Sequence, residues 1–291
     1  MPELPEVEVT RRRIEGLLVG RRISRVLTTA RSYFFLTDPR LLRRRLPGRE
    51  ITGLDRHGKY LIARLDDGQR LLLHLGMSGQ LFGENAASPR LLSASARAAL
   101  SPQEQAAFTP DRHTHLQLCF EDGGARVLMR DVRKFGKVRL LQPGEREPRL
   151  EKLGVDALAA TAEQLFQATR GRKVQIKSLL LDQASIAGIG NIYADECLFR
   201  ARLRPTRRAH RVARKECEAL IEALHEILQR AIDSGGSSIS DYVAPDGRDG
   251  SYQDERYVYA RAAEPCPVCA TPIRKISIAQ RGTHFCPKCQ R

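Results

Sequence analysis

The sequence Cys266-Pro-Val-Cys269, followed by Cys286-Pro-Lys-Cys289, decides the fold of the C-terminal region. Each pair can place two thiolates on one metal ion from a tight turn, and the 16 residues between the pairs suit a β-hairpin. Four thiolates leave no open coordination position, which predicts one structural zinc ion. An iron–sulfur cluster is the alternative, but paired turns of this kind are typical of zinc ribbons.

Two glycine-containing motifs suggest contacts with phosphate groups. The first, GIGN at 188–191, lies between two expected helices, and Lys173 and Lys177 stand one helical turn apart just before it. The second, RG at 281–282, lies at the tip of the expected zinc hairpin. Each motif also has a plainer interpretation as a tight turn with solvated basic side chains, and the residues alone leave both interpretations open.

The chain has 291 residues and a formal net charge of +15, which favours a polyanionic partner such as nucleic acid. A GC-rich genome that prefers arginine is the alternative explanation, but exchanging lysine for arginine leaves the net charge unchanged. Glu3, Glu6 and Glu8 stand where a secretory signal would be apolar, and no apolar run approaches the ~18 residues of a membrane span. We therefore expect a cytoplasmic protein with no membrane partner.

The apolar pattern predicts an α+β protein. A helix is expected at 4–19, and a β-sandwich or barrel then follows from strand-like runs at 23–27, 60–65, 70–75, 115–120, 126–129 and 137–141. After a linker at 143–148, helices are expected at 162–169, 173–183, 189–200 and 211–234. The stretch 84–112, with a weak helical pattern at 94–100, interrupts the strands and is interpreted as a surface excursion.

Removal of Met1 would expose the secondary amine of Pro2. An α-amine has a pKa near ~8, so part of it is neutral and nucleophilic at neutral pH. Attack on the anomeric carbon of a sugar would give an iminium ion, an electron sink that promotes loss of the adjacent phosphates, with Glu3 as general acid or base. Met77 and Phe135 have glycine and polar or basic neighbours, as expected of side chains that enter a base stack, although packing in a core is the commoner role.

Six motifs occur along the chain in this order: MPELPEVE at 1–8, HGKY at 57–60, HLGMSG at 74–79, RDVRKFG at 130–136, GIGNIYADE at 188–196 and the two cysteine pairs. Their form and order resemble the formamidopyrimidine-DNA glycosylase family, bacterial enzymes that remove oxidised purines. The resemblance implies three domains: an N-terminal helix with a β-sandwich (1–145), a helix–two-turn–helix domain (146–240), and a lesion-capping loop at 244–253 with a zinc-finger β-hairpin (241–291).

The resemblance also assigns roles to matching residues. Pro2 would be the Schiff-base nucleophile, Glu3 the proton donor in base release, Lys59 the residue that assists β-elimination and Arg281 the one tied to δ-elimination. The wedge that fills the gap left by an extruded base would comprise Met77, Arg133 and Phe135. Further DNA contacts are expected from His113, Lys173, Lys177 and Asn191, and the zinc ligands would be Cys266, Cys269, Cys286 and Cys289.

The implied activity is that of a bifunctional DNA glycosylase and AP lyase of base excision repair, which cleaves the strand by β,δ-elimination. Its partner would be double-stranded DNA containing oxidised purines such as 8-oxoguanine and formamidopyrimidines, and the protein is expected to be a monomer at the bacterial nucleoid. One alternative is the related endonuclease VIII, which prefers oxidised pyrimidines; the PELPEVE form argues against it. Another is a DNA-binding zinc protein without catalysis, which would require neither Glu3 nor Lys59.

Two departures from the family pattern stand out. The segment 84–112 is inserted between Met77 and His113, and Val132 stands where the most familiar motif has proline. Arg133 and Phe135 are retained, so the predicted wedge is complete.

Overall fold

The computed structural model describes residues 2–84, 86, 108, 110–238 and 242–291. The weak helical pattern expected at 94–100 lies outside these residues. The chain divides into two compact units, the first comprising residues 1–147 and 234–253 and the second residues 148–233 and 254–291. Among the helices within the described ranges, none has the length and apolar character needed to cross a lipid bilayer.

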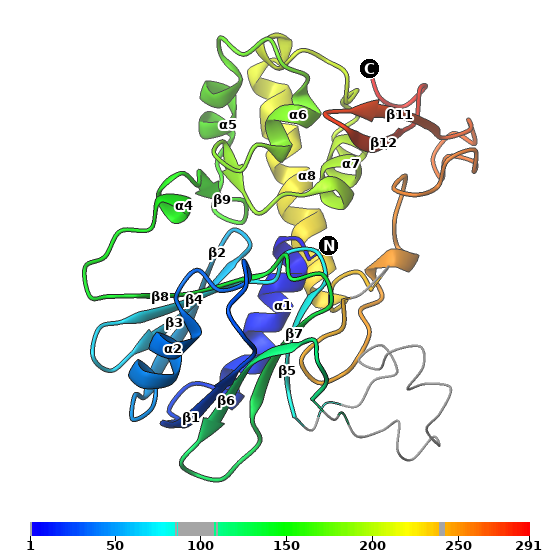
Figure 1. The fold of residues 1–291 in the computed structure, drawn as a ribbon. Helices are drawn as coiled ribbons and strands as arrows, with labels where there is room; N and C mark the ends of the chain where they lie inside the picture. Colours follow the sequence, from blue (N-terminus) through cyan, green and yellow to red (C-terminus); the bar gives the residue numbers. More distant parts are fainter. Residues whose placement is uncertain (1, 85, 87–107, 109, 239–241) are drawn as a thin grey trace, which may run out of the picture. The chain divides into compact units, whose positions relative to one another are not determined.

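The first unit contains two four-stranded antiparallel sheets, as the predicted β-sandwich requires (Figure 1). One sheet has the order β1-β6-β7-β5, formed by Ile23–Thr28, Thr114–Phe120, Val127–Asp131 and Gly79–Gly83. The other has the order β2-β3-β4-β8, formed by Ile51–His57, Tyr60–Leu65, Arg70–His74 and Lys137–Leu141. Apolar residues of both sheets share one core cluster with residues of α1 (Leu4–Ile14) and α2 (Pro39–Arg45).

Four elements of this unit differ from the expectation. The first helix ends at Ile14 and continues only as a 3-10 turn at Glu15–Leu17. Strands β2 and β5 and helix α2 were not expected. Glycine interrupts β2 at Gly53 and bounds β5 at both ends, and every residue of β5 is buried, so neither strand shows the alternation that marks a half-buried strand.

Most of the loops that carry predicted site residues lie at one end of the sandwich. β1 and β7 end where β6 and β5 begin, because the sheet is antiparallel throughout. The loop from β4 to β5 (75–78) and the loop from β7 to β8 (132–136) pass from one sheet to the other at this end. The turn between β2 and β3 (58–59) also lies at this end of its sheet, since His57 pairs with Tyr60 and Tyr60 pairs with His74, the last residue of β4.

Helix α1 is tied to the sandwich by a buried acidic residue. The Glu8 carboxylate accepts hydrogen bonds from Arg11, Arg12 and Arg56, the last at 2.9 Å from strand β2. Burial alone would raise the pKa of Glu8, but these guanidinium groups outweigh it and lower the pKa from its ordinary 4.5 to about 2. The charged form is therefore the one that stabilises the fold.

Replacing this carboxylate is expected to change how stability depends on pH. Because the pKa of Glu8 is lower in the folded chain, its contribution is complete above about pH 4.5 and is lost as pH falls towards about 2. Glu8→Gln should cost on the order of 2–3 kcal/mol at pH 7, and the difference from wild type should shrink below pH 4.5. Urea unfolding at pH 7 and pH 3 measures this. Glu15→Gln, at an exposed partner of Arg11, is the control, and a pH-independent effect of Glu8→Gln would contradict the assignment.

The second unit is largely helical, with a hairpin at its C-terminal end (Figure 1). Its main helix α8 (Arg214–Asp233) packs against α5 (Ala162–Thr169) and α7 (Asn191–Arg200), and it buries the apolar stripe expected from the sequence. The remaining elements are α4 (Pro148–Glu151), β9 (Val155–Asp156), α6 (Ile176–Leu181), β10 (Ile186–Ala187), the 3-10 turn Ala209–Arg211, and the hairpin strands β11 (Arg274–Ile278) and β12 (Arg281–Phe285). Helix α6 is shorter than expected, so Lys173 precedes it.

The units group the chain differently from the three expected domains. Residues 234–253 belong with the sandwich, where the Ser237 N–H donates to Glu6 at 2.8 Å and Arg13 pairs with Asp246 at 2.9 Å. The zinc hairpin belongs with the helices, and β12 packs against α7. The segment expected to cap a lesion is thus part of the unit that carries Pro2.

Candidate functional site

Pro2 and Glu3 are buried at the start of α1. Both oxygens of the Glu6 carboxylate hold this region, because Oε2 accepts the Glu3 backbone N–H at 2.8 Å and Oε1 accepts the Ser237 N–H at 2.8 Å. Glu6 itself is 1% exposed. The residue next to the expected nucleophile therefore has a fixed backbone. The sequence analysis did not single out Glu6, although a glutamate three residues after Glu3 fits the capping-box pattern of a helix start.

Lys59 occupies the two-residue turn between β2 and β3. The preceding Gly58 has φ +54°, a left-handed conformation suited to a tight hairpin turn. Arg56 donates to the Gly58 carbonyl at 3.0 Å while its guanidinium also binds Glu8 of α1. The same arginine thus connects α1, the helix that follows Pro2 and Glu3, with the turn that carries Lys59.

The three wedge residues lie on two turns at the same end of the sandwich, Met77 on 75–78 and Arg133 and Phe135 on 132–136. Phe135 is 42% exposed, an unusual state for a large aromatic side chain. The Arg133 guanidinium lies 4.9 Å from the centre of the Phe135 ring, a cation–π arrangement. Arg133 and Phe135 are exposed to solvent, as the wedge interpretation requires, whereas Met77 is half-buried.

Buried Asp131 joins the two wedge turns. One carboxylate oxygen accepts from the Ser78 hydroxyl at 2.6 Å and from the Arg133 N–H at 3.1 Å, and the other accepts the Gly136 N–H at 2.7 Å. Gly76 packs so closely against the second turn that a Cβ on it would lie 2.5 Å from the Gly136 nitrogen. Contacts within the protein therefore fix the two turns to each other.

Two further side chains that the sequence did not single out support the second wedge turn. The Tyr33 hydroxyl donates to the Arg133 carbonyl at 2.7 Å, and Lys137 donates to the Phe135 and Gly136 carbonyls at 3.2 and 3.0 Å. The Lys137 ammonium also lies 5.0 Å from the centre of the Tyr33 ring. Because Tyr33 is distant from the wedge motif in the sequence, only the fold could reveal its role.

His113 lies just before β6, at the same end of the sandwich. Its backbone N–H donates to Asp111, which also binds Arg130 at 2.9 Å. Burial lowers the pKa of His113, so the ring is neutral at physiological pH and its Nε2 accepts from Arg112 at 3.2 Å.

In the second unit, Lys177 does not take the position expected of it. Its side chain is fully buried, forms an ion pair with Asp195 at 2.7 Å, and donates to the Gly282 carbonyl and the Thr283 hydroxyl at 3.1 and 2.8 Å. The direct DNA contact expected of Lys177 does not fit this buried position. Lys173 is exposed in the loop before α6.

Hydrogen bonds with α7 hold the zinc hairpin at the residues that follow Arg281. Asn191, the first residue of α7, donates to the Gly282 carbonyl at 3.0 Å, and Asp195 accepts the His284 backbone N–H at 2.8 Å. Arg281 itself is exposed and follows a two-residue turn, Ala279-Gln280, in which both residues have positive φ. The buried Lys177–Asp195 pair thus supports the segment that presents Arg281. The predicted β-hairpin between the cysteine pairs is confirmed.

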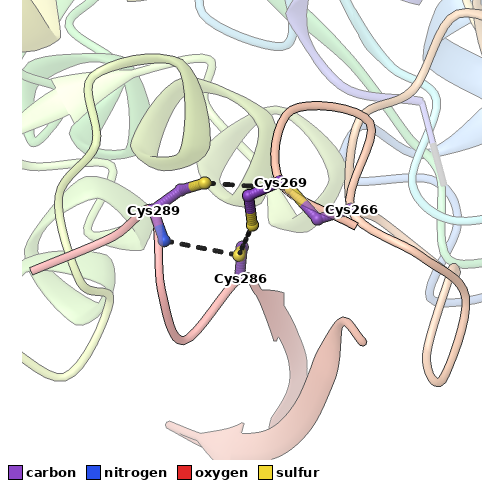
Figure 2. Close-up of side chains that lie close together, drawn as sticks. All are labelled: Cys266, Cys269, Cys286 and Cys289. Carbon is purple, nitrogen blue, oxygen red and sulfur yellow. Dashed lines mark hydrogen bonds between the residues drawn. The ribbon is translucent and has the colours of Figure 1, made fainter. Parts of the chain in front are cut away.

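The four predicted zinc ligands converge at the base of this hairpin (Figure 2). Their sulfur atoms all lie within 4.8 Å of one another, with separations of 3.9 Å for Cys266–Cys289 and 3.5 Å for Cys269–Cys286. A tetrahedron with metal–sulfur bonds of about 2.3 Å has sulfur–sulfur edges of about 3.8 Å. The donor set and its spacing fit one structural zinc ion, which when bound cross-links the two turns.

Comparison with known proteins identifies the family. Residues 1–138 match the formamidopyrimidine-DNA glycosylase N-terminal domain, residues 153–243 the formamidopyrimidine-DNA glycosylase H2TH domain, and residues 263–291 the zinc finger found in FPG and IleRS. The chain belongs to the formamidopyrimidine-DNA glycosylase family. The formamidopyrimidine-DNA glycosylases of Symbiobacterium thermophilum and Gluconobacter oxydans are each 42% identical to it, covering 100% of this chain and 89% and 100% of those relatives.

Solved structures of the family agree with this fold. The MutM (FPG) protein from Thermus thermophilus is 36% identical with a TM-score of 0.82, covering 99% of this chain and 98% of that one. Lactococcus lactis Fpg, in a complex with DNA containing an abasic site, is 35% identical with a TM-score of 0.84, covering 99% of each chain. As a formamidopyrimidine-DNA glycosylase family member, the chain is a DNA glycosylase of oxidised-base repair with one structural zinc site.

Proposed function

We propose that this glycosylase removes oxidised purines, including 8-oxoguanine and formamidopyrimidines, and then cleaves the strand by β,δ-elimination. The observation that carries the proposal is the gathering of Lys59, His113 and the Met77/Arg133/Phe135 wedge at one end of the sandwich, in the unit where Pro2 and Glu3 directly precede the first helix. We also expect it to act as a monomer on duplex DNA at the nucleoid.

Pro2 is the proposed nucleophile once Met1 has been removed. Its nitrogen would form a bond to C1′ of the damaged nucleotide as the bond from C1′ to the base breaks, with Glu3 donating a proton to the departing base. The proline nitrogen then loses its N–H proton, and the C1′–O4′ bond breaks as O4′ takes up a proton. The product is an iminium ion that has no N–H proton left to lose. This cation withdraws electrons, so a proton leaves C2′ and the 3′ phosphate departs. Loss of a proton from C4′ of the resulting conjugated iminium then releases the 5′ phosphate.

Lys59 and Arg281 are the proposed partners in these eliminations. A cationic side chain beside a departing phosphate stabilises the negative charge that develops on it. Lys59 would assist the first elimination and Arg281 the second. Lys173 and Asn191 are proposed DNA contacts of the second unit, whereas Lys177 would act only through the segment that follows Arg281, because its ammonium is already bound to Asp195 and Thr283.

The wedge would fill the space left by the extruded nucleotide, because a flipped base leaves an unstacked gap. Asp131 is proposed to set the wedge shape by joining its two turns. In Asp131→Asn, the side-chain amide has one acceptor oxygen and cannot accept all the hydrogen bonds that the carboxylate accepts now. Each hydrogen bond to a charged group contributes about 1.5–3 kcal/mol to stability. Base release from a lesion duplex should therefore fall at least about tenfold, while cleavage at a single-stranded abasic site should change little. Gel assays of both substrates measure this.

The control for this variant is Asp122→Asn, at an exposed turn of the same unit that binds Arg21 at 2.7 Å. It should leave both rates unchanged. Equal loss of both activities in Asp131→Asn would contradict the wedge role, because it would indicate a general effect on the fold or the active site.

Trapping with borohydride tests the proposed reaction. The iminium intermediate would be reduced to a stable protein–DNA adduct on an 8-oxoguanine duplex and not on an undamaged one. A thymine-glycol duplex run in parallel distinguishes the endonuclease VIII preference, and binding without any adduct would indicate a protein that recognises damage without catalysis. Adduct formation on 8-oxoguanine that exceeds that on thymine glycol is the expected result.

A further inference from the structure

A basic pocket in the first unit lies apart from every residue assigned above. It has a volume of about 380 Å³ and is lined by Thr29, Arg31, Asp38, Arg40 and Arg43, among others. All three arginines are exposed, so the pocket presents three guanidinium groups and a single carboxylate. Guanidinium groups match the geometry of phosphate oxygens.

The carboxylate in this pocket is engaged with the protein. Asp38 caps helix α2, where its Oδ1 accepts the Arg40 backbone N–H at 2.8 Å, and its other oxygen lies 3.8 Å from the Arg31 guanidinium. Arg43 is steadied by a hydrogen bond to the Thr28 hydroxyl at 2.7 Å. The pocket therefore keeps an excess of positive charge, with the Arg43 side chain held in position by Thr28, which suits a bound anion.

The position of the pocket suggests which anion. It lies where β1 ends, and the sheet order β1-β6-β7-β5 places it in one row with His113 before β6, Arg133 after β7 and Met77 before β5. A short chain of contacts runs along this row: the Thr29 hydroxyl bonds His115 Nδ1 at 3.0 Å, and His115 Nε2 bonds the Asp131 carbonyl at 2.9 Å. The pocket and the wedge thus share one edge of one rigid sheet.

The geometry points to a binding site for a DNA backbone phosphate in this pocket, within about three nucleotides of the extruded one. β1 and β7 are two strand spacings apart, or roughly 10 Å at ~4.8 Å per spacing, and a DNA strand advances ~3.4 Å per nucleotide. This inference rests on the proposed function, because the wedge defines where the duplex lies. The pocket would add a phosphate contact beyond His113, on the side away from the wedge.

The test compares two double variants of equal charge. Arg40→Ala with Arg43→Ala removes two pocket arginines of α2. Arg25→Ala with Arg44→Ala removes two exposed arginines that lie outside the pocket, one on β1 and one on α2. Binding to a duplex with a tetrahydrofuran abasic analogue is measured as a function of salt. The pocket variant should bind about tenfold more weakly, with the slope of log K against log salt reduced by about 0.9. The control should keep the wild-type slope.

A scan with neutral methylphosphonate linkages locates the phosphate. In wild type and control, one substituted position within about three nucleotides of the analogue should weaken binding, and the pocket variant should show no further loss there. Arg40→Lys with Arg43→Lys should restore most of the slope, which a merely misfolded variant could not do. Equal slopes in the two Ala variants, or no position that depends on the pocket, would overturn the inference. If wild type itself fails to prefer the analogue duplex, the proposed function fails with it.

Discussion

Adding one glycine before Pro2 is expected to reduce borohydride trapping on 8-oxoguanine DNA to background. The extension turns the proline nitrogen into an amide, whose lone pair is delocalised and cannot attack C1′. Pro2 is also buried at the start of a helix whose next residue is fixed by Glu6, so an added residue has little freedom to place its own amine at the same point. Base release and strand cleavage should be lost together.

The matched control keeps the amine and removes the acid. Glu3→Gln should still form an adduct on a duplex with a preformed abasic site, because no base has to leave. Its release of 8-oxoguanine should fall by about 10²–10⁴-fold, the range for loss of a general acid. Removing the added glycine with a protease should restore trapping. An extended chain that traps as well as wild type would place the nucleophile elsewhere.

Cys286→Ser is expected to cause the second large loss, by emptying the zinc site. Cys286 is fully buried at the base of the hairpin, and structural zinc contributes about 10–16 kcal/mol to folding in zinc-finger peptides. Without the metal the hairpin should detach from α6 and α7, leaving the Lys177–Asp195 pair without its partners at Gly282, Thr283 and His284. Such exposure of a buried pair destabilises the helices as well.

The measurements are the zinc content per chain, the thermal unfolding midpoint and binding to the abasic-analogue duplex. Zinc should fall from one to none, and binding should fall at least about tenfold because Arg281 is no longer presented. Cys119→Ser, at a cysteine of strand β6 outside the cluster, is the control and should retain its zinc. Full zinc content and binding in Cys286→Ser would contradict a four-thiolate site.

The parts of the site that could be predicted are those whose residues stand close together in the sequence as short motifs. The spacing of the cysteine pairs is enough to indicate both the metal and the hairpin, since chain geometry between the pairs leaves few alternatives. Glycine and basic or polar neighbours indicated that Met77 and Phe135 lie on turns, where the structure has them, whereas the wedge role proposed for them came from the resemblance to the family.

The misjudged residues depend on partners far along the chain. Lys177 looks like a surface lysine by sequence, and only Asp195 and Thr283, which are distant in sequence, make its burial possible. Tyr33 supports the wedge from a position 100 residues before Arg133. The loop expected at 244–253 gave no sign in the sequence of its contact with α1, because that contact depends on Asp246 meeting Arg13 near the N-terminus. Local periodicity does not record such long-range pairs.

The carboxylate of Glu6 leaves its position little evolutionary freedom. Its two oxygens accept N–H groups from distant parts of the chain, one from Glu3 and one from Ser237. Glutamine has only one acceptor oxygen, so its amide nitrogen would face one of these donors, and aspartate is one methylene shorter. A substitution at residue 6 would therefore weaken the attachment of both the start of the chain and the segment that contains Ser237. Mutations in either partner segment must therefore preserve an arrangement that only one amino acid satisfies.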